Sequence, residues 1–577
     1  MNKKASLLFI QILIVILVVG CSKDKSNYYR SVNLNGQFEI IGKQPIADSI
    51  SPKVACYHFT YDKSGKVSEI VYLENGKQSV DEYLGVSKIT FVYSDEFVTR
   101  KYTNENGKPM FNKAGCFSQR FKLDENNNIV SMYNYDRKDA LAEDKYGVVQ
   151  YKWVLNKDGQ AVSTLFINES GQRVNNYYGF YEIARKYDGT NNIIETKYLN
   201  ENNKLIADEY GIAHIICQFD NRGNIFEEKH FDSNDLLLNK GTYAILREKY
   251  DNRDNRIEQL YLDNNEKLLE GETGVALRRY KYDEYGHIIE VICFGADNQL
   301  KQLKGWGVAI MKTKYDLNGN LVENSYYGTD EKLKECFNNG IAIERFKYDA
   351  NNYKIEERYY GANGALKDNY EVGAAIVCYK WNNIGLPVEK SYYDIQGKLK
   401  NHLKLNMAIV RFKYDKNRNI VEKSHFSKNK QLNDSCFYGS AIMRFKYDDQ
   451  GYSNEVEYYN ANNQLTENSK HGYAIVKYEN DNLGRIFEET YYDRNGALKL
   501  DKFYNYSSCS FTYDINGNVI EESHYGLDGN LKGNIPFSAA VVRYKYDKQN
   551  KIIHTDYFDV NMNLQSAPYG MTYSVQN

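Results

Sequence analysis

The sequence predicts an all-β chain, built as an elongated, curved β-sheet or β-solenoid of about sixteen tandem β-hairpin repeats. Two observations lead to this prediction. The 577 residues contain 54 Tyr and 40 Gly but only 6 Pro, a composition typical of many short aromatic strands joined by turns. A Tyr-Asp phrase also recurs along most of the chain, and no Pro-rich linker divides it into separate domains.

Residues 1–20 are predicted to be a lipoprotein signal peptide. Two lysines precede an apolar run that ends at Val19 and is too short to cross a bilayer as a helix. The junction Gly20-Cys21 resembles the lipobox of bacterial lipoproteins. That resemblance implies a diacylglyceryl thioether and an acylated amine on Cys21, with palmitate-type chains as the membrane anchor. Because Ser22 is not the Asp that commonly accompanies inner-membrane retention, we expect an outer-membrane lipoprotein that faces the periplasm or the cell surface.

The recurring Tyr-Asp phrase divides the rest of the chain. We expect residues 21–56 to be the lipidated N-terminus and a polar tether, 57–186 to be degenerate repeats that form a cap, and 187–577 to be regular repeats. The spacing between anchors is 33 residues from Tyr282 onward and 30 to 32 residues before it. The sixteen anchors, each the Tyr of Tyr-Asp or its equivalent, are Tyr61, Tyr93, Leu123, Leu155, Tyr187, Phe219, Tyr250, Tyr282, Tyr315, Tyr348, Trp381, Tyr414, Tyr447, Asn480, Tyr513 and Tyr546.

Each repeat is expected to contain two main strands. Residues before an anchor, such as 472–479, alternate in the way that is typical of a half-buried strand. A turn follows the anchor, as where Asp316 can cap the turn and Gly319 accepts a positive φ. A second strand comes next. Another turn then leads to a Leu that recurs twelve times, from Leu205 to Leu564.

Opposed charges predict the register of these hairpins. If the strands pair across a two-residue loop, the basic residue three before each anchor faces the Glu eight after it. The same register sets an Ala, found six before ten of the anchors, against the aromatic residue eleven after the anchor. The pairs expected to face each other are Arg247/Glu258, Arg279/Glu290, Lys312/Glu323, Arg345/Glu356, Arg411/Glu422, Arg444/Glu455 and Lys477/Glu488.

Two phrases carry a family resemblance over roughly residues 57–577. Tyr-Lys-Tyr-Asp and Phe-Lys-Tyr-Asp resemble the YD repeats of RHS-type bacterial surface and toxin proteins, which implies hairpins wound into a spiral shell. The segment from Tyr360 to Leu366 is similar to MORN-like repeat lipoproteins. RHS repeats are usually shorter, and the self-cleaving region of RHS toxins has no evident counterpart. Because the repeats run to the C-terminus of the sequence, no enclosed toxin is expected.

No catalytic residue, metal site or cofactor is predicted. His230, His425 and His524 share the position eleven after their anchors that is usually Tyr, so we interpret them as filler on a strand. We interpret the recurrent Glu as the partner of a basic residue, because a catalytic pair needs two carboxylates in different environments. The eight cysteines after Cys21 occupy scattered positions and are expected to be mainly single thiols; a disulfide between adjoining repeats stays open.

Tyr pairs in the second strand are the candidate ligand contacts. Consecutive side chains of a strand point to opposite faces, so one ring of each pair is expected in the core and the other on the surface. Surface rings can stack on sugars or contact cations. The candidates are Tyr327, Tyr360, Tyr393, Tyr459, Tyr492 and Tyr525.

The charge balance excludes one class of partner. A formal charge of -2 and a pI near 6.6 give no field that would gather nucleic acid. The lipobox, the sixteen repeats and the absence of a unique site lead us to expect a non-enzymatic, lipid-anchored scaffold. We expect it to contact the membrane through its anchor and to bind a protein or a glycan at the cell envelope. One alternative is a glycan- or peptidoglycan-binding accessory or hydrolase of the envelope, and the other is an RHS-like β shell.

Overall fold

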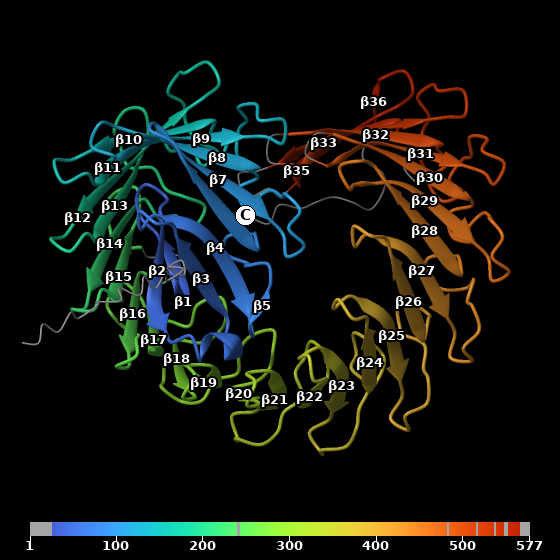
Figure 1. Cartoon of the computed structure of the whole chain (residues 1–577), viewed down its shortest axis with the longest axis horizontal. Coiled ribbons are helices and arrows are strands. Elements are labelled where there is room, and N and C mark those ends of the chain that lie inside the picture. The colour runs from blue at the N-terminus through green and yellow to red at the C-terminus, as the bar shows by residue number, and fades with distance from the viewer. Residues whose placement is uncertain are drawn as a thin grey trace, which may run out of the picture.

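A computed structural model describes residues 26–238, 243–481, 484–514, 517–535, 538–546 and 552–565. The predicted signal peptide and the predicted lipidation site Cys21 both lie outside these residues. In the part described, 36 strands form one antiparallel sheet, and the helical structure is a single 3-10 turn, η1 (Ser51–Lys53). The predicted all-β, curved sheet of tandem hairpins is confirmed (Figure 1).

Every anchor is the last residue of a strand. A second strand pairs with this first strand and then with the first strand of the next repeat, as β21 does with β20 and β22. The recurrent Leu forms one bridge to the end of the second strand, as Leu333 does to Tyr327. The first strands are β3 (Cys56–Tyr61), β6 (Lys88–Tyr93), β8 (Ser118–Leu123), β10 (Gln150–Leu155), β12 (Glu182–Tyr187), β14 (His214–Phe219), β16 (Ile245–Tyr250), β18 (Leu277–Tyr282), β20 (Ile310–Tyr315), β22 (Ile343–Tyr348), β24 (Ile376–Trp381), β26 (Ile409–Tyr414), β28 (Ile442–Tyr447), β30 (Ile475–Asn480), β32 (Ser508–Tyr513) and β34 (Val541–Tyr546). The second strands are β4 (Val67–Glu74), β7 (Phe97–Thr103), β9 (Ile129–Tyr135), β11 (Ala161–Ile167), β13 (Ile193–Leu199), β15 (Ile225–Phe231), β17 (Arg256–Leu262), β19 (Ile288–Phe294), β21 (Leu321–Tyr327), β23 (Lys354–Tyr360), β25 (Pro387–Tyr393), β27 (Ile420–Phe426), β29 (Ser453–Tyr459), β31 (Ile486–Tyr492), β33 (Val519–Tyr525) and β35 (Ile552–Phe558). The other strands are β1 (Ser26–Leu34), β2 (Ile40–Ile46), β5 (Lys77–Gln78) and β36 (Leu564–Gln565).

The anchor turn, meaning the five residues after an anchor, is usually built around an Asp or Asn side chain. In the turn 316–320, Oδ1 of Asp316 accepts hydrogen bonds from the backbone N–H groups two and four residues further on, both at 2.9 Å. Gly319 has a φ of 82° in this turn, a conformation that glycine adopts at little cost. The strand pairing also shifts just before the anchor Tyr315, so a bulge precedes the turn.

The prediction of a two-residue loop is wrong, because the turn has five residues. The predicted strand register, which depended on that loop, is therefore wrong as well. The pairing moves by two residues, so that Lys314 faces Glu323 within its hairpin, and Arg345 of the next repeat faces Glu323 from the other side. Each basic residue of the expected pairs contacts the Glu one repeat earlier than expected. The contacts are Arg247–Glu227, Arg279–Glu258, Lys312–Glu290, Arg345–Glu323, Arg411–Glu389, Arg444–Glu422 and Lys477–Glu455.

These contacts form a ladder of alternating charges on one face of the sheet, here called the charged face. Burial raises the pKa of Glu323, but hydrogen bonds from Lys314 and Arg345 outweigh this effect and hold its pKa below the ordinary value. The predicted role of the recurrent Glu, as the partner of basic residues, therefore fits the structure. The ladder joins successive repeats wherever a carboxylate shares its two oxygens between them, as Glu323 does. It is interrupted at Glu356, which faces Cys378, and at Glu488, which faces Ser510.

The opposite face, here called the aromatic face, holds the core. Segments that connect the repeats fold over it, so that Tyr473 of one connection stacks on Tyr491 with ring centres 4.5 Å apart. The recurrent alanines are fully buried: Ala408 has an exposed fraction of 0%, and its carbonyl accepts the N–H of Tyr392. Tyr392 belongs to the preceding repeat, so the expected pairing of Ala with the aromatic residue of its own repeat is wrong for the same reason as the charges.

Residues 26–56 do not form the polar tether that the sequence predicts. β1 pairs with β2 on one side and with β3 on the other, so this segment extends the sheet. Tyr28 stacks on His58 with ring centres 4.4 Å apart, and Val32 is buried in the same cluster as Phe59. The prediction relied on the polar residues at the start of the segment and did not consider the apolar side chains that hold it to the sheet.

The sheet coils, so that its N-terminal strands lie against a later part of the same sheet. Figure 1 shows β1–β5, in blue, beside β16–β21. Lys108 donates to Asn419 across 311 residues at 2.7 Å, and the guanidinium of Arg137 lies 4.4 Å from the ring centre of Tyr452. Because a repeat has about 33 residues, these contacts join repeats that are about nine or ten apart along the chain.

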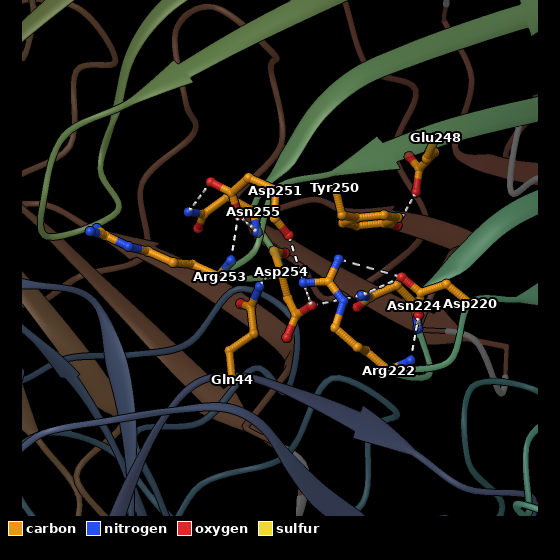
Figure 2. Close-up of polar contacts among 10 residues, drawn as sticks. All are labelled: Gln44, Asp220, Arg222, Asn224, Glu248, Tyr250, Asp251, Arg253, Asp254 and Asn255. Carbon is orange, nitrogen blue, oxygen red and sulfur yellow. Dashed lines mark hydrogen bonds and ion pairs between the residues drawn. The ribbon is translucent and has the colours of Figure 1, made fainter.

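Adjacent anchor turns are linked side by side along this seam. Figure 2 shows Arg222 and Asn224 of one turn reaching Asp254 of the next turn, at 2.9 and 2.8 Å. Gln44 of β2 donates to the backbone carbonyl of Asp254. The row of anchor turns therefore holds the N-terminal hairpin β1–β2 as well as its own neighbours.

Candidate functional site

A cleft near the N-terminus interrupts the regular packing of the repeats and is here called the N-terminal cleft. It has a volume of about 370 Å³ and lies where the tip of the β1–β2 hairpin meets the second to fourth repeats. Leu34, Ile40 and Met132 give it an apolar lining. Phe38, at the tip of the hairpin, closes one side and packs edge-on against Tyr151, with ring centres 5.1 Å apart.

Arg100 lines this cleft from β7 and is only 6% exposed. Its guanidinium lies 4.2 Å from the ring centre of Phe121 and 5.4 Å from that of Phe91. Among the described residues no acidic side chain forms an ion pair with Arg100, and its Nε atom has no hydrogen-bond partner. Burial accordingly lowers the pKa of the Arg100 guanidinium.

A chain of hydrogen bonds runs beside Arg100 along the aromatic face. The Tyr102 hydroxyl donates to Oε1 of Gln119 at 2.5 Å, and Nε2 of Gln119 donates to Oδ1 of Asn134 at 2.9 Å. Nδ2 of Asn134 donates to the backbone carbonyl of Val148, also at 2.9 Å. These side chains fix one another, so the polar wall of the cleft is already organised before any ligand enters.

Asp144 is the acidic group of the cleft, and its role is structural. Its Oδ1 accepts the backbone N–H groups of Tyr146 and Val148, and its Oδ2 accepts the hydroxyl of Tyr151 at 2.6 Å. Burial raises the pKa of Asp144 to about 6, although these three hydrogen bonds oppose the shift. Asp144 forms no ion pair with Arg100, and its oxygens contact its own turn and Tyr151 instead.

The arrangement is suited to binding an anion with an apolar body. A buried cation without an acidic partner costs on the order of several kcal/mol, of which contacts with aromatic faces recover about 0.5–2 kcal/mol. A carboxylate that entered the cleft would pair with the fork of N–H donors on Arg100 while its apolar part contacted Leu34, Ile40 and Phe38.

Sequence reasoning missed this site. Arg100 faces Phe91 across its hairpin. In other repeats the residue at this position is Glu357, opposite Phe346, or Val456, opposite Phe445. The second repeat has a shorter turn than the others, so counting from its anchor does not align Arg100 with those residues. The sequence does contain one signal for the site, a single Arg among the residues of the aromatic face. This signal can be recognised only when the strand register is known.

The six tyrosines predicted to contact a ligand lie on the charged face and are half-buried. The structure does not bring them to the N-terminal cleft. Four of them already carry a basic side chain of their own repeat over the ring: Lys312 over Tyr327, Arg345 over Tyr360, Arg444 over Tyr459 and Lys477 over Tyr492. The hydroxyls of the other two contact serines, Tyr393 with Ser391 and Tyr525 with Ser510, both at 3.3 Å.

The cysteines and the three histidines at the Tyr position, His230, His425 and His524, lie mostly in the interior. The eight cysteines from Cys56 to Cys509 are free thiols, six of them buried. His425 is fully buried and stacks on Tyr438 with ring centres 4.9 Å apart, as expected of filler. In the described part of the chain, no helix has the length and apolar character needed to cross a membrane.

Comparisons with known proteins give matches only among solved structures. No model of a protein family matches the chain, and no curated protein matches it. A crystal structure of TcdB2-TccC3-TEV is similar to 86% of this chain at 11% identity and a TM-score of 0.42. The Photorhabdus luminescens Tc holotoxin pore is similar to 87% of it at 11% identity and a TM-score of 0.40. The chain covers 23% and 22% of those two chains, respectively.

Proposed function

We propose that this chain is a non-enzymatic, lipid-anchored scaffold of the outer membrane, whose N-terminal cleft holds a small ligand with a carboxylate and an apolar body. The row of hairpins supplies the frame, and the carboxylates that recur along it are committed to ion pairs such as Lys314–Glu323–Arg345. Because the sheet coils, the RHS-like β shell, one of the alternatives from the sequence, is supported as the architecture of this scaffold. The lipobox-like junction at Cys21 supports the anchor.

The observation that carries the proposal is the buried guanidinium of Arg100, which forms no ion pair. Its side chain is 6% exposed, and its aromatic contacts and hydrogen bond with Tyr102 offset only part of the lost hydration. A ligand carboxylate supplies the remaining compensation, and the apolar lining of the cleft excludes anions that lack an apolar part.

Two carboxylates of different origin test the proposal by titration calorimetry on the full-length protein in detergent. Decanoate carries its carboxylate on an apolar chain, whereas N-acetylmuramyl dipeptide, a peptidoglycan fragment, carries its carboxylate on a polar body. Binding of decanoate but not of the dipeptide supports the proposed ligand class. If decanoate does not bind, although a control shows that the protein is folded, or if both bind equally, the proposed ligand class is wrong.

Arg100→Met is the matched variant, because it keeps the length of the side chain and removes its charge. We expect it to lose binding and to be at least as stable as the parent, since no buried charge remains. Arg185→Met is the control. Arg185 is a half-buried arginine on the aromatic face that is outside the cleft and donates to Thr164 at 2.6 Å. Equal loss of binding in both variants would contradict a specific role for Arg100.

The anchor and the wider partners are tested separately. Cys21→Ala should move the protein from the membrane fraction to the soluble fraction, and continued lipid labelling would contradict the anchor. A glycan or protein partner on the charged face is the second candidate, supported by the half-buried rings of Tyr393 and Tyr525. A pull-down from envelope extracts, repeated with both rings changed to Ser, should lose that partner.

A further inference from the structure

Three possible metal ligands meet in one repeat near the C-terminal end of the described chain. Cys509 lies on β32 directly opposite His524 on β33, and Glu522 lies two residues before His524. One ligand atom from each residue lies within 4.8 Å of the other two, and no other such group occurs in the described residues. We propose that Cys509, Glu522 and His524 form a binding site for a divalent transition-metal ion, with zinc as the best match.

The hydrogen bonds of His524 favour a metal on its Nε2 atom. Nδ1 lies 3.1 Å from the backbone carbonyl of Ala539, and a carbonyl can only accept, so Nδ1 carries the proton. Nε2 lies 2.7 Å from Oε1 of Glu522, which is also an acceptor. The His230–Glu228 pair makes the same kind of contact, so this contact alone does not mark a metal site. At His524 the thiol of Cys509 adds a third ligand atom within 4.8 Å of the other two. A backbone carbonyl on Nδ1 is also the usual way in which a metal-bound histidine is oriented.

The charge around the cluster also favours a cation. Glu489 lies opposite Cys509 on the neighbouring strand β31, so Cys509 has an acidic residue on either side. Glu522 also accepts the hydroxyl of Tyr544 at 3.1 Å, which holds its second oxygen. A divalent ion that displaced the thiol proton would balance this local excess of negative charge.

The ligand types favour zinc and a structural role. Thiolate, imidazole and carboxylate together suit zinc, whereas calcium and magnesium prefer oxygen ligands. Cys509 and His524 both have an exposed fraction of 0%, and Tyr506 stacks on His524 with ring centres 4.5 Å apart. A substrate could not reach such a site without opening the repeat. The ion would therefore tie β32 to β33 rather than perform chemistry.

The repeats themselves provide matched controls. His425 takes the position of His524 in its own repeat, but Val410 stands there in place of Cys509 and Lys423 in place of Glu522. The sequence pattern treats His425 and His524 alike, as filler. The structure separates them, because only His524 has two further ligands beside it.

Zinc titration of the full-length protein tests this inference after treatment with a chelator. We expect one zinc ion per chain by calorimetry, a raised melting temperature, and a thiolate-to-metal absorption band when cobalt replaces zinc. His524→Tyr and Cys509→Val should each lose the ion, because Tyr and Val are the residues that other repeats place there. His425→Tyr should retain it.

Three outcomes would overturn the inference: no bound ion in the parent protein, a bound ion retained in both His524→Tyr and Cys509→Val, or an equal loss in His425→Tyr. Circular dichroism identifies a variant that fails to fold, and the remaining variant then decides the result. The decanoate titration is independent of this measurement, because the N-terminal cleft shares no residue with the cluster.

Discussion

Arg345 donates through Nε to Oε2 of Glu323 in the preceding repeat at 2.7 Å, while Lys314 holds Oε1 of the same carboxylate at 2.7 Å. One carboxylate therefore couples two strands of its own hairpin to the next hairpin. Where this relationship recurs along the charged face, it ties one hairpin to the next in a single register.

The register is tested by a double-mutant cycle on Glu323→Gln and Arg345→Met. Because Arg345 is half exposed, we expect a modest coupling of about 0.5–1 kcal/mol in the free energy of unfolding, measured with urea. The control cycle pairs Arg345→Met with Glu356→Gln, the partner that the sequence alone suggested, and should give no coupling. Coupling between Arg345 and Glu356, without coupling between Arg345 and Glu323, would contradict the observed register and support the one that the sequence suggested.

The buried alanines should not tolerate a larger side chain. Ala408→Leu is expected to destabilise the fold by about 1–3 kcal/mol, because the side chain has an exposed fraction of 0% and no space to expand. Ala362→Leu, in an exposed turn, is the control and should have little effect. Thermal unfolding measures both, and equal melting temperatures would show that the alanine position is not tightly packed.

Arg137 provides one of the contacts between distant repeats. Arg137→Ala removes a cation that lies 4.4 Å from the ring centre of Tyr452, which we expect to weaken the contact by about 0.5–2 kcal/mol. Hydrogen exchange should then become faster in residues 448–452, where that ring lies. Arg253→Ala, whose contact is with the adjacent turn, is the control. Unchanged exchange in Arg137→Ala would mean that the coils are held elsewhere.

Glu195 should make stability depend on pH. Burial raises its pKa, but ion pairs with Lys186 and Lys197 outweigh this and lower the pKa from 4.5 to about 2. A lowered folded-state pKa stabilises the fold above the unfolded value, and that contribution is lost as the pH falls from about 4.5 to about 2. The melting temperature of the parent should exceed that of Glu195→Gln at neutral pH and approach it near pH 2. A constant difference would contradict the shift.

The strands could be predicted from the sequence because their signals are local. Tyr-Asp marks a strand end followed by a capped turn, and all sixteen anchors end strands. The register could not be predicted, because the bulge before Tyr315 and the length of its turn leave no separate mark in the sequence. The N-terminal cleft was hidden for another reason. Phe38 and Arg100 are far apart in the chain and meet only when the β1–β2 hairpin folds over later repeats.

Native mass spectrometry of the protein extracted from its own membrane tests whether Arg100 forms a ligand site. We expect an extra mass on the parent protein and on Arg185→Met, released as a small carboxylate on unfolding and absent from Arg100→Met. A bare parent chain, or the same ligand on Arg100→Met, would contradict a binding site built around Arg100.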